Sequence, residues 1–151
     1  MLDDVDRRIL RQWQAAPSLS PAELADRAGV SGAQVSRRLA RLQDQGVIEA
    51  VAWDVGWVAL GYSVQVSLRV TLDKTAPRAF DEFIAAAQKI PEVLEIQTFL
   101  GRVDVRLNLI ARDMADYQMI YRDRVLTLPH LADIEALMQV ARIKSDETVP
   151  L

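Results

Sequence analysis

The chain has 151 residues, of which 50% are hydrophobic, so it is long and apolar enough to build one ordinary domain or two small ones. It contains no cysteine, which excludes disulfides, thiolate metal sites and a cysteine nucleophile and is typical of a reducing compartment. The net charge of -3 argues against a protein that coats nucleic acid through overall positive charge. No apolar run approaches the roughly 20 residues that span a bilayer, and the first residues lack the profile of a signal peptide. We therefore expect a cytoplasmic protein that does not associate with membranes.

The hydrophobic pattern changes character near residue 50. Before this point apolar residues recur at the spacing of amphipathic helices, and after it long stretches alternate with a period of two, with helical stretches between them. We predict an α+β fold in three parts: an N-terminal winged helix-turn-helix in residues 1–50, a linker strand in residues 51–60, and a ferredoxin-like βαββαβ domain in residues 61–151.

The hydrophobic pattern of residues 1–50 predicts three helices. Val5, Ile9 and Trp13 fall at four-residue intervals, which places one apolar stripe on a helix that begins at Asp3 or Asp4 and ends near Ala16.

Two further helices begin at serine capping boxes. Ser20 is followed by proline and, at the third position, by Glu23, while Ser31 is followed at the same distance by Gln34. Gly29 stands where the second helix ends by turning left-handed. Gly46 closes the third helix, and the β-prone residues 47–51 after it predict a wing or linking strand.

The second part predicts four strands and two helices. The strands fall at about residues 62–72, 93–100, 103–110 and 131–142, with Gly101–Arg102 as a tight turn between the second and third. One helix opens at Pro77 and the other is capped by Asp113. Their predicted inward residues are Phe80, Ile84 and Ala87 in the first helix and Met114, Tyr117, Tyr121 and Val125 in the second.

The third helix of the first part carries the clearest functional signal. Residues 31–43 contain three arginines and no acid, although residues 1–55 as a whole are nearly neutral. Burial of Val35, Leu39 and Leu42 turns the polar residues of this helix outward, where a glutamine can bond an adenine and an arginine a guanine. The predicted DNA-contacting residues are Ser31, Ala33, Gln34, Ser36, Arg37, Arg38 and Arg41. Which arginine reads a base stays open, since Arg38 or Arg41 can instead hold phosphate, and solvated arginines on a protein-binding scaffold are the alternative.

The motifs of the first part resemble one family of regulators. They are residues 2–10 (LDDVDRRIL), 24–31 (LADRAGVS), 35–42 (VSRRLARL) and 46–48 (GVI). They are similar to the N-terminal half of the Lrp/AsnC, or feast/famine, transcriptional regulators, and the second part and the ending at residues 143–151 also resemble that family. The resemblance implies binding to pseudo-palindromic double-stranded DNA, homodimers that often assemble into octamers or related rings, and an amino-acid effector held between subunits.

The resemblance also implies an effector-binding turn between the second and third strands. The family pattern is a Gly-Asp-x-Asp-like turn, and here Gly101 and Asp104 match it while Arg102 replaces the first acid and Ala136 stands where many relatives have Ser or Thr. Asp104 offers an anion for an ammonium group, and the loop N–H groups or the Arg102 guanidinium offer donors for a carboxylate. Alternatively, Gly101 only permits the turn and Asp104 pairs with Arg102 or Arg106.

Two other functions share this fold. Some haem-pathway decarboxylases resemble the family in fold and use basic side chains, notably histidines, around a tetrapyrrole, but His130 is the only histidine here and it precedes the last predicted strand. A co-assembling subunit that does not bind DNA is expected to lose the arginines of the third helix. We therefore expect a DNA-binding regulator with no catalytic residues, no cofactor and no metal site.

Overall fold

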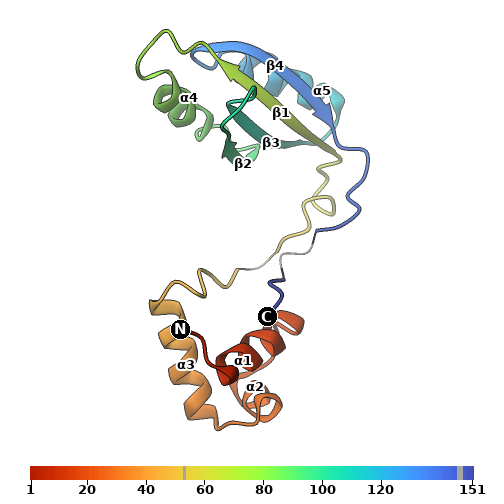
Figure 1. Ribbon diagram of the computed structural model, residues 1–151. Coiled ribbons are helices and arrows are strands. Elements are labelled where there is room, and N and C mark those ends of the chain that lie inside the picture. The colour runs from red at the N-terminus through yellow and green to blue at the C-terminus, as the bar shows by residue number, and fades with distance from the viewer. Residues whose placement is uncertain (53, 146–147) are drawn as a thin grey trace. The chain divides into compact units, whose positions relative to one another are not determined.

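The computed structural model describes residues 1–52, 54–145 and 148–151, which divide into two compact units. Unit 1 comprises Met1–Asp54 and Lys144–Leu151, and unit 2 comprises Val55–Ile143 (Figure 1). Residues 144–151, which lie within the predicted domain 61–151, thus group with the helices of unit 1. Periodicity does not reveal this, since the contacts of that segment are with residues far away in the sequence.

Unit 1 consists of three helices that begin where their caps predict. Helix α1 spans Asp4–Ala15, α2 spans Pro21–Ala28 and α3 spans Gly32–Asp44. Each begins at a reciprocal capping box, in which the side chains of the N-cap residue and of the third helical residue accept from each other's backbone N–H. Gly29 has φ +68°, the left-handed conformation that ends α2 and allows α3 to start three residues later.

The apolar faces of the three helices form one small core. Its buried members are Ile9, Leu24, Ala25, Ala28 and Val35, and Val5, Trp13, Leu19, Val30 and Leu39 pack against them. Leu39, predicted as an inward residue, is only half-buried, whereas Val35 and Leu42 are fully buried. The core fixes α3 against α2, which is the geometry of a helix-turn-helix.

The predicted wing and linker strand do not form. Residues 47–52 are irregular after α3, and residues 54–60 contain only a turn, while residue 53 lies outside the described residues. A strand needs a neighbour to pair its backbone groups. The described residues supply none here, so β-propensity alone does not make a strand.

Unit 2 is a four-stranded antiparallel sheet with two helices. The elements follow the predicted βαββαβ order: β1 (Val64–Leu72), α4 (Ala79–Ala87), β2 (Val93–Thr98), β3 (Val105–Ala111), α5 (Met114–Ile120) with its π-helical extension η1 (Tyr121–Val125), and β4 (Leu131–Met138). The strand order is β2-β3-β1-β4. This is the ferredoxin-like arrangement, and it confirms the predicted α+β class.

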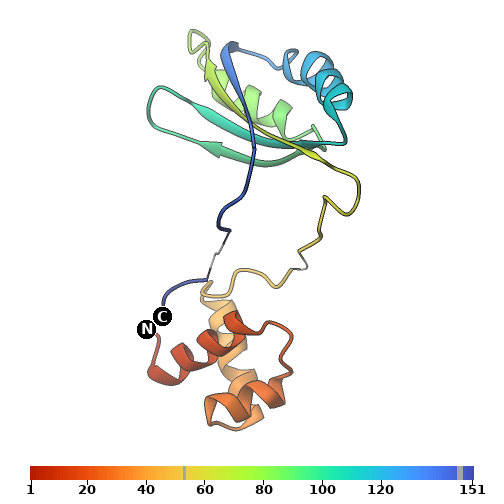
Figure 2. The ribbon, with the colours of Figure 1, turned by 90° about the vertical axis from the view of Figure 1, so that its right-hand side faces the viewer.

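Both helices cover the same face of the sheet (Figures 1 and 2). Alternate residues of β1 point into this core, as the period-two pattern predicts, and pair across the sheet with residues of β3 and β4. The buried strand residues of this core are Val66, Leu68, Val70, Leu72, Val105, Leu107, Leu109 and Ala111. The other face of the sheet carries the polar residues of β1, which no element of unit 2 covers within the described part of the chain.

The helical predictions need small corrections. Helix α4 starts at Ala79 rather than at Pro77, and its most buried large side chain is Phe83, while Phe80 and Ile84 are half-buried beside it. Met114 is 45% exposed rather than inward, because it stands at the first position of α5 before the helix reaches the sheet.

The hairpin between β2 and β3 is wider than the predicted two-residue turn. The Phe99 N–H donates to the Asp104 carbonyl at 2.9 Å, so four residues, 100–103, form the connection. The first and last strands are also shorter than predicted, since β1 starts at Val64 and β4 ends at Met138. Among the described residues, no helix has both the length and the apolar content that crossing a membrane requires.

Candidate functional site

The predicted DNA-contacting residues lie along α3 and at its N-terminus, but they are not equally accessible. Six of them are exposed: Ser31, Ala33, Gln34, Ser36, Arg37 and Arg41. The side chain of Arg38 is only 26% exposed and that of Arg41 is 43% exposed. The three arginines of the helix therefore occupy different environments.

Arg37 lies on the side of α3 opposite its buried stripe. It follows the fully buried Val35 by two residues, which is roughly half a turn of helix. Its Nε donates to the Ala33 carbonyl of the same helix at 3.4 Å, a long and weak contact. Arg37, Gln34, Arg38 and Arg41 line a surface hollow of about 270 Å³.

Ser31 and Gln34 form hydrogen bonds with each other that cap α3. The Ser31 N–H donates to Gln34 Oε1 at 3.2 Å, and the Gln34 N–H donates to Ser31 Oγ at 3.3 Å. An adenine contact by glutamine needs both its oxygen and its nitrogen. In the conformation described here, the Gln34 oxygen already serves the N-terminus of α3.

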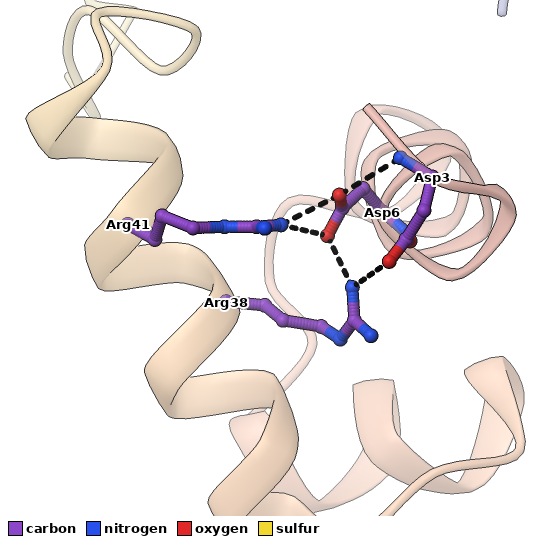
Figure 3. A network of polar contacts seen from close by, with 4 residues as sticks. All are labelled: Asp3, Asp6, Arg38 and Arg41. Atoms are coloured by element: carbon purple, nitrogen blue, oxygen red, sulfur yellow. Dashed lines mark hydrogen bonds and ion pairs between the residues drawn. The ribbon is translucent and has the colours of Figure 1, made fainter. Parts of the chain in front are cut away.

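Arg38 and Arg41 converge on two carboxylates of α1 and its cap (Figure 3). Arg38 Nη1 lies 2.7 Å from Asp3 Oδ2 and 2.7 Å from Asp6 Oδ1. Arg41 Nη2 lies 2.6 Å from each Asp6 oxygen. The Asp3 N–H also donates to Asp6 Oδ2 at 3.0 Å, so every oxygen of the fully buried Asp6 carboxylate is bonded. This network joins α3 to α1 and leaves the remaining guanidinium N–H groups outside it.

The network lowers the pKa of both carboxyl groups. The hydrogen bond from Arg38, together with that from the Asp6 N–H, lowers the pKa of Asp3 from 3.8 to about 2. Burial acts to raise the pKa of Asp6, but hydrogen bonds from the Asp3 N–H, Arg38 and Arg41 outweigh it and hold this pKa below its usual value. Both groups are therefore ionised at neutral pH, and both arginines are paired.

Sequence reasoning missed Asp3 and Asp6 as partners of the arginines. Residues 31–43 contain no acid, and the acids that pair with Arg38 and Arg41 come from α1 and its N-cap, more than 30 residues earlier. The three-residue spacing of Asp3 and Asp6 before an apolar helix is itself a capping-box signal. That signal indicates the local cap, not the contact with α3.

In unit 2, the predicted effector residue Asp104 is buried and already paired. Its Oδ2 accepts from the Leu72 N–H at 2.9 Å, and its Oδ1 lies 2.7 Å from Lys74 Nζ. Burial acts to raise the pKa of Asp104, but the hydrogen bond from the Leu72 N–H and the Lys74 ammonium outweigh burial and hold this pKa below its usual value. Asp104 is therefore ionised at neutral pH. Its salt-bridge partner is thus Lys74, and the expected alternatives Arg102 and Arg106 are wrong.

Gly101 and Arg102 share the hairpin loop with Asp104, and both are exposed. The Arg102 carbonyl accepts from Thr71 Oγ1 at 3.1 Å, and the Asp104 N–H donates to the Val70 carbonyl at 2.9 Å. The loop is thereby tied to the end of β1. The structure brings Asp104 together with Lys74, an ammonium group on the segment that follows β1, which sequence reasoning missed.

Comparison with known proteins identifies both units. A model of the AsnC-type helix-turn-helix domain matches residues 2–43, and a model of the Lrp/AsnC ligand binding domain matches residues 65–149. The chain is 32% identical over 143 residues to the leucine-responsive regulatory protein of Salmonella typhimurium, covering 95% of this chain and 87% of that protein. It is 31% identical over 132 residues to the proline dehydrogenase transcriptional activator of Rhodobacter capsulatus, covering 87% of this chain and 86% of that protein.

Solved structures share the whole architecture. A transcriptional regulator of Neisseria meningitidis in complex with L-Met superposes with a TM-score of 0.91 at 27% identity, covering 99% of this chain and 97% of that one. An AsnC family regulator of Agrobacterium tumefaciens gives a TM-score of 0.88 at 26% identity, with the same coverage.

A helix-turn-helix joined to a ligand-binding domain of this kind defines a DNA-binding transcriptional regulator. The chain belongs to the Lrp/AsnC family of these regulators, which confirms the family suggested by its motifs.

The role of Asp6 gives a stability prediction. Replacing Asp6 with Asn removes the charge that pairs Arg38 and Arg41, and we expect the free energy of unfolding of the full chain to fall by about 2 kcal/mol. Urea denaturation followed by circular dichroism measures this. The matched control is Asp4→Asn in the same first turn, where the aspartate is exposed and the expected loss is under about 0.5 kcal/mol. Equal losses in the two variants would show that the network does not stabilise the unit.

The lowered pKa of Asp3 gives a pH prediction. Because this pKa falls from 3.8 to about 2 in the folded chain, Asp3 contributes stability that is complete above the unfolded pKa and is lost as the pH falls toward 2. We expect the Tm of wild type to exceed that of Asp3→Asn at pH 6, and the difference to shrink between pH 4 and pH 2. Asparagine is also a good N-cap, so the variant keeps the cap and changes the charge. A difference in Tm that is constant with pH contradicts this origin.

Proposed function

We propose that the chain binds a pseudo-palindromic operator as a homodimer or a larger ring, with one α3 helix from each of two subunits in the major groove. The motif supports this, since a helix-turn-helix places the N-terminal turns of its second helix against base edges. The charge balance also supports it. One head offers few phosphate contacts in a chain of net charge -3, so strong binding needs two heads.

Within each head, we propose that Arg37 reads a base and that Arg38 and Arg41 contact phosphate. The observation that carries this division is that Arg37 is exposed opposite the core, whereas Asp3 and Asp6 hold the other two guanidinium groups in place. A base-reading arginine needs both N–H groups of one edge for O6 and N7 of guanine. An arginine already paired on one side still offers single N–H groups to a phosphate oxygen.

The open face of the sheet in unit 2 supports the proposed assembly. It carries polar side chains that bond one another across strands, such as Arg106 with Gln97 and Asn108 with Glu95. Arg106 Nε is nevertheless buried without a partner among the described residues. Such groups are normally satisfied in a complete structure, so this face is suited to cover by a second subunit.

Replacing Arg37 with Ala tests the DNA-reading role. We expect operator affinity to fall by about 10- to 100-fold, the size of one lost guanine contact, and affinity for unrelated DNA to change much less. Fluorescence anisotropy at physiological salt, with the upstream region of the protein's own gene as the operator, measures both. Arg41→Ala is expected to weaken binding to both DNAs and to reduce the salt slope by about one.

Arg11→Ala is the matched control, because Arg11 is an exposed arginine of the same unit outside α3. It should retain operator affinity within about threefold. Deleting one half-site of the operator should weaken wild-type binding more than Arg37→Ala does if two heads bind together. Wild-type binding without preference for the operator would reject the proposed function.

We also propose that an amino acid binds at the hairpin loop of residues 101–104, between subunits, and shifts the assembly toward one state. The relative from Neisseria meningitidis was solved with L-Met, which supports this class of ligand. The Lys74 ammonium, on a side chain that is 60% exposed, stands where an effector ammonium would pair with Asp104. An effector would therefore displace Lys74, while loop N–H groups or Arg102 receive its carboxylate. It switches the protein only if one assembly binds it better.

Asp104→Asn is the test of this pocket. We expect it to remove the thermal shift that an effective amino acid gives to wild type, since a neutral amide does not hold an ammonium, while operator binding without effector is retained. A screen of the twenty amino acids by thermal shift supplies the ligand. Asp133→Asn, an exposed carboxylate of β4, serves as the control and should keep the response. An unchanged response in Asp104→Asn would exclude this pocket.

A further inference from the structure

The last residues of the sequence belong to the DNA-binding unit. Unit 2 is inserted between Asp54 and Lys144, and the chain then returns to unit 1 for residues 144–151. Two chain connections, one after α3 and one after β4, therefore join the units. A single flexible linker would be enough to attach a helix-turn-helix, so the second connection must be held to unit 1 by specific contacts.

The side chain of Gln14 in α1 binds the returning segment. The Val149 N–H donates to Gln14 Oε1 at 2.7 Å, and Gln14 Nε2 donates to the Val149 carbonyl at 3.4 Å. One amide thus bonds both backbone groups of a residue 135 positions away in sequence, as a neighbouring β-strand would. This pattern recognises extended backbone, and Val149 is biased to be extended because Pro150 follows it.

Val149 and Leu151 line an apolar groove of about 630 Å³ in unit 1. Leu10 and Trp13 of α1, Pro17 of the turn after it and residues 47–52 also line this groove. Residues two apart in an extended chain point the same way, so both side chains face the groove together. Val149 remains 56% exposed and Leu151 is half-buried, so side-chain burial and the Gln14 amide both contribute to the docking.

We propose that residues 148–151 are a clasp that docks on α1 of their own chain and forms part of the DNA-binding unit. Through the clasp, the end of β4 is coupled to α1, the helix whose Asp6 fixes Arg38 and Arg41. The recognition helix is thereby attached to the ligand-binding unit at both ends of the insertion. The clasp itself does not depend on the proposed function, whereas its effect on operator binding rests on it.

The absence of cysteine from the chain allows a direct test of the clasp. In the full-length protein we introduce Gln14→Cys with Val149→Cys and, as the matched pair, Gln12→Cys with Val149→Cys. Gln12 lies on the same helix, about half a turn away from Gln14. A short bis-maleimide should join the first pair at least about fivefold faster than the second, and intact-mass spectrometry should show the product at the mass of one chain. Equal rates would mean an undocked segment, and a product of two chains would mean that the clasp belongs to a partner. Either result overturns the proposal.

The coupling is tested in the otherwise native sequence. Gln14→Ala removes both hydrogen bonds without harming the helix, and operator affinity should fall by roughly threefold to tenfold. Gln12→Ala should stay within about twofold of wild type. Native affinity in Gln14→Ala overturns the coupling. If wild type itself shows no operator preference, the proposed function fails, while the cross-linking rates still decide the clasp.

Discussion

The carboxylate of Asp6 in α1 holds two arginine side chains of α3 in place. It is fully buried, and it accepts two hydrogen bonds from Arg41, one from Arg38 and one from the Asp3 N–H. A buried charge is tolerated only when it is paired and bonded in this way. The same contacts that satisfy Asp6 therefore fix the position of two of the three arginines on the recognition helix, and with them the surface that the helix presents.

Asp3 and Asp6 fix the positions of Arg38 and Arg41 and at the same time offset their positive charge. Arg37, by contrast, has no salt bridge to an acid among the described residues. In the proposed function such a head binds DNA weakly by itself, because affinity follows the number of neutralised phosphates. Such a head is suited to a protein in which assembly multiplies the contacts, and thus to control by anything that changes the assembly.

Asp104 does in unit 2 what Asp6 does in unit 1. The two are the buried charged residues of the described chain, and each accepts from a backbone N–H and pairs with a cation from another segment. The difference lies in the cation. Arg38 and Arg41 are restrained on a helix, whereas Lys74 lies on an exposed segment after β1 and exchanges more readily for another ammonium group. The first carboxylate thus suits a fixed joint and the second a site that can change its partner.

The sequence by itself determined the elements that local interactions specify. Ser20, Gly29 and Ser31 locate the helix-turn-helix, because caps bond groups three or four residues away. The alternation along β1 likewise predicts which side chains are buried, because it depends only on the geometry of the strand. Together with the family motifs, these signals were sufficient for the fold class and the place of the DNA-binding helix.

Only the tertiary structure decided which charged groups pair and where the chain returns. Asp6 with Arg38 and Arg41, Asp104 with Lys74, and Gln14 with Val149 join residues about 30 to 135 positions apart, and no periodicity marks such pairs. For the same reason residues 47–51 were predicted as a strand: the propensity is local, but a strand forms only beside a partner. The sequence of a single helix or strand therefore predicts its local structure, whereas contacts between distant segments depend on how the whole chain folds.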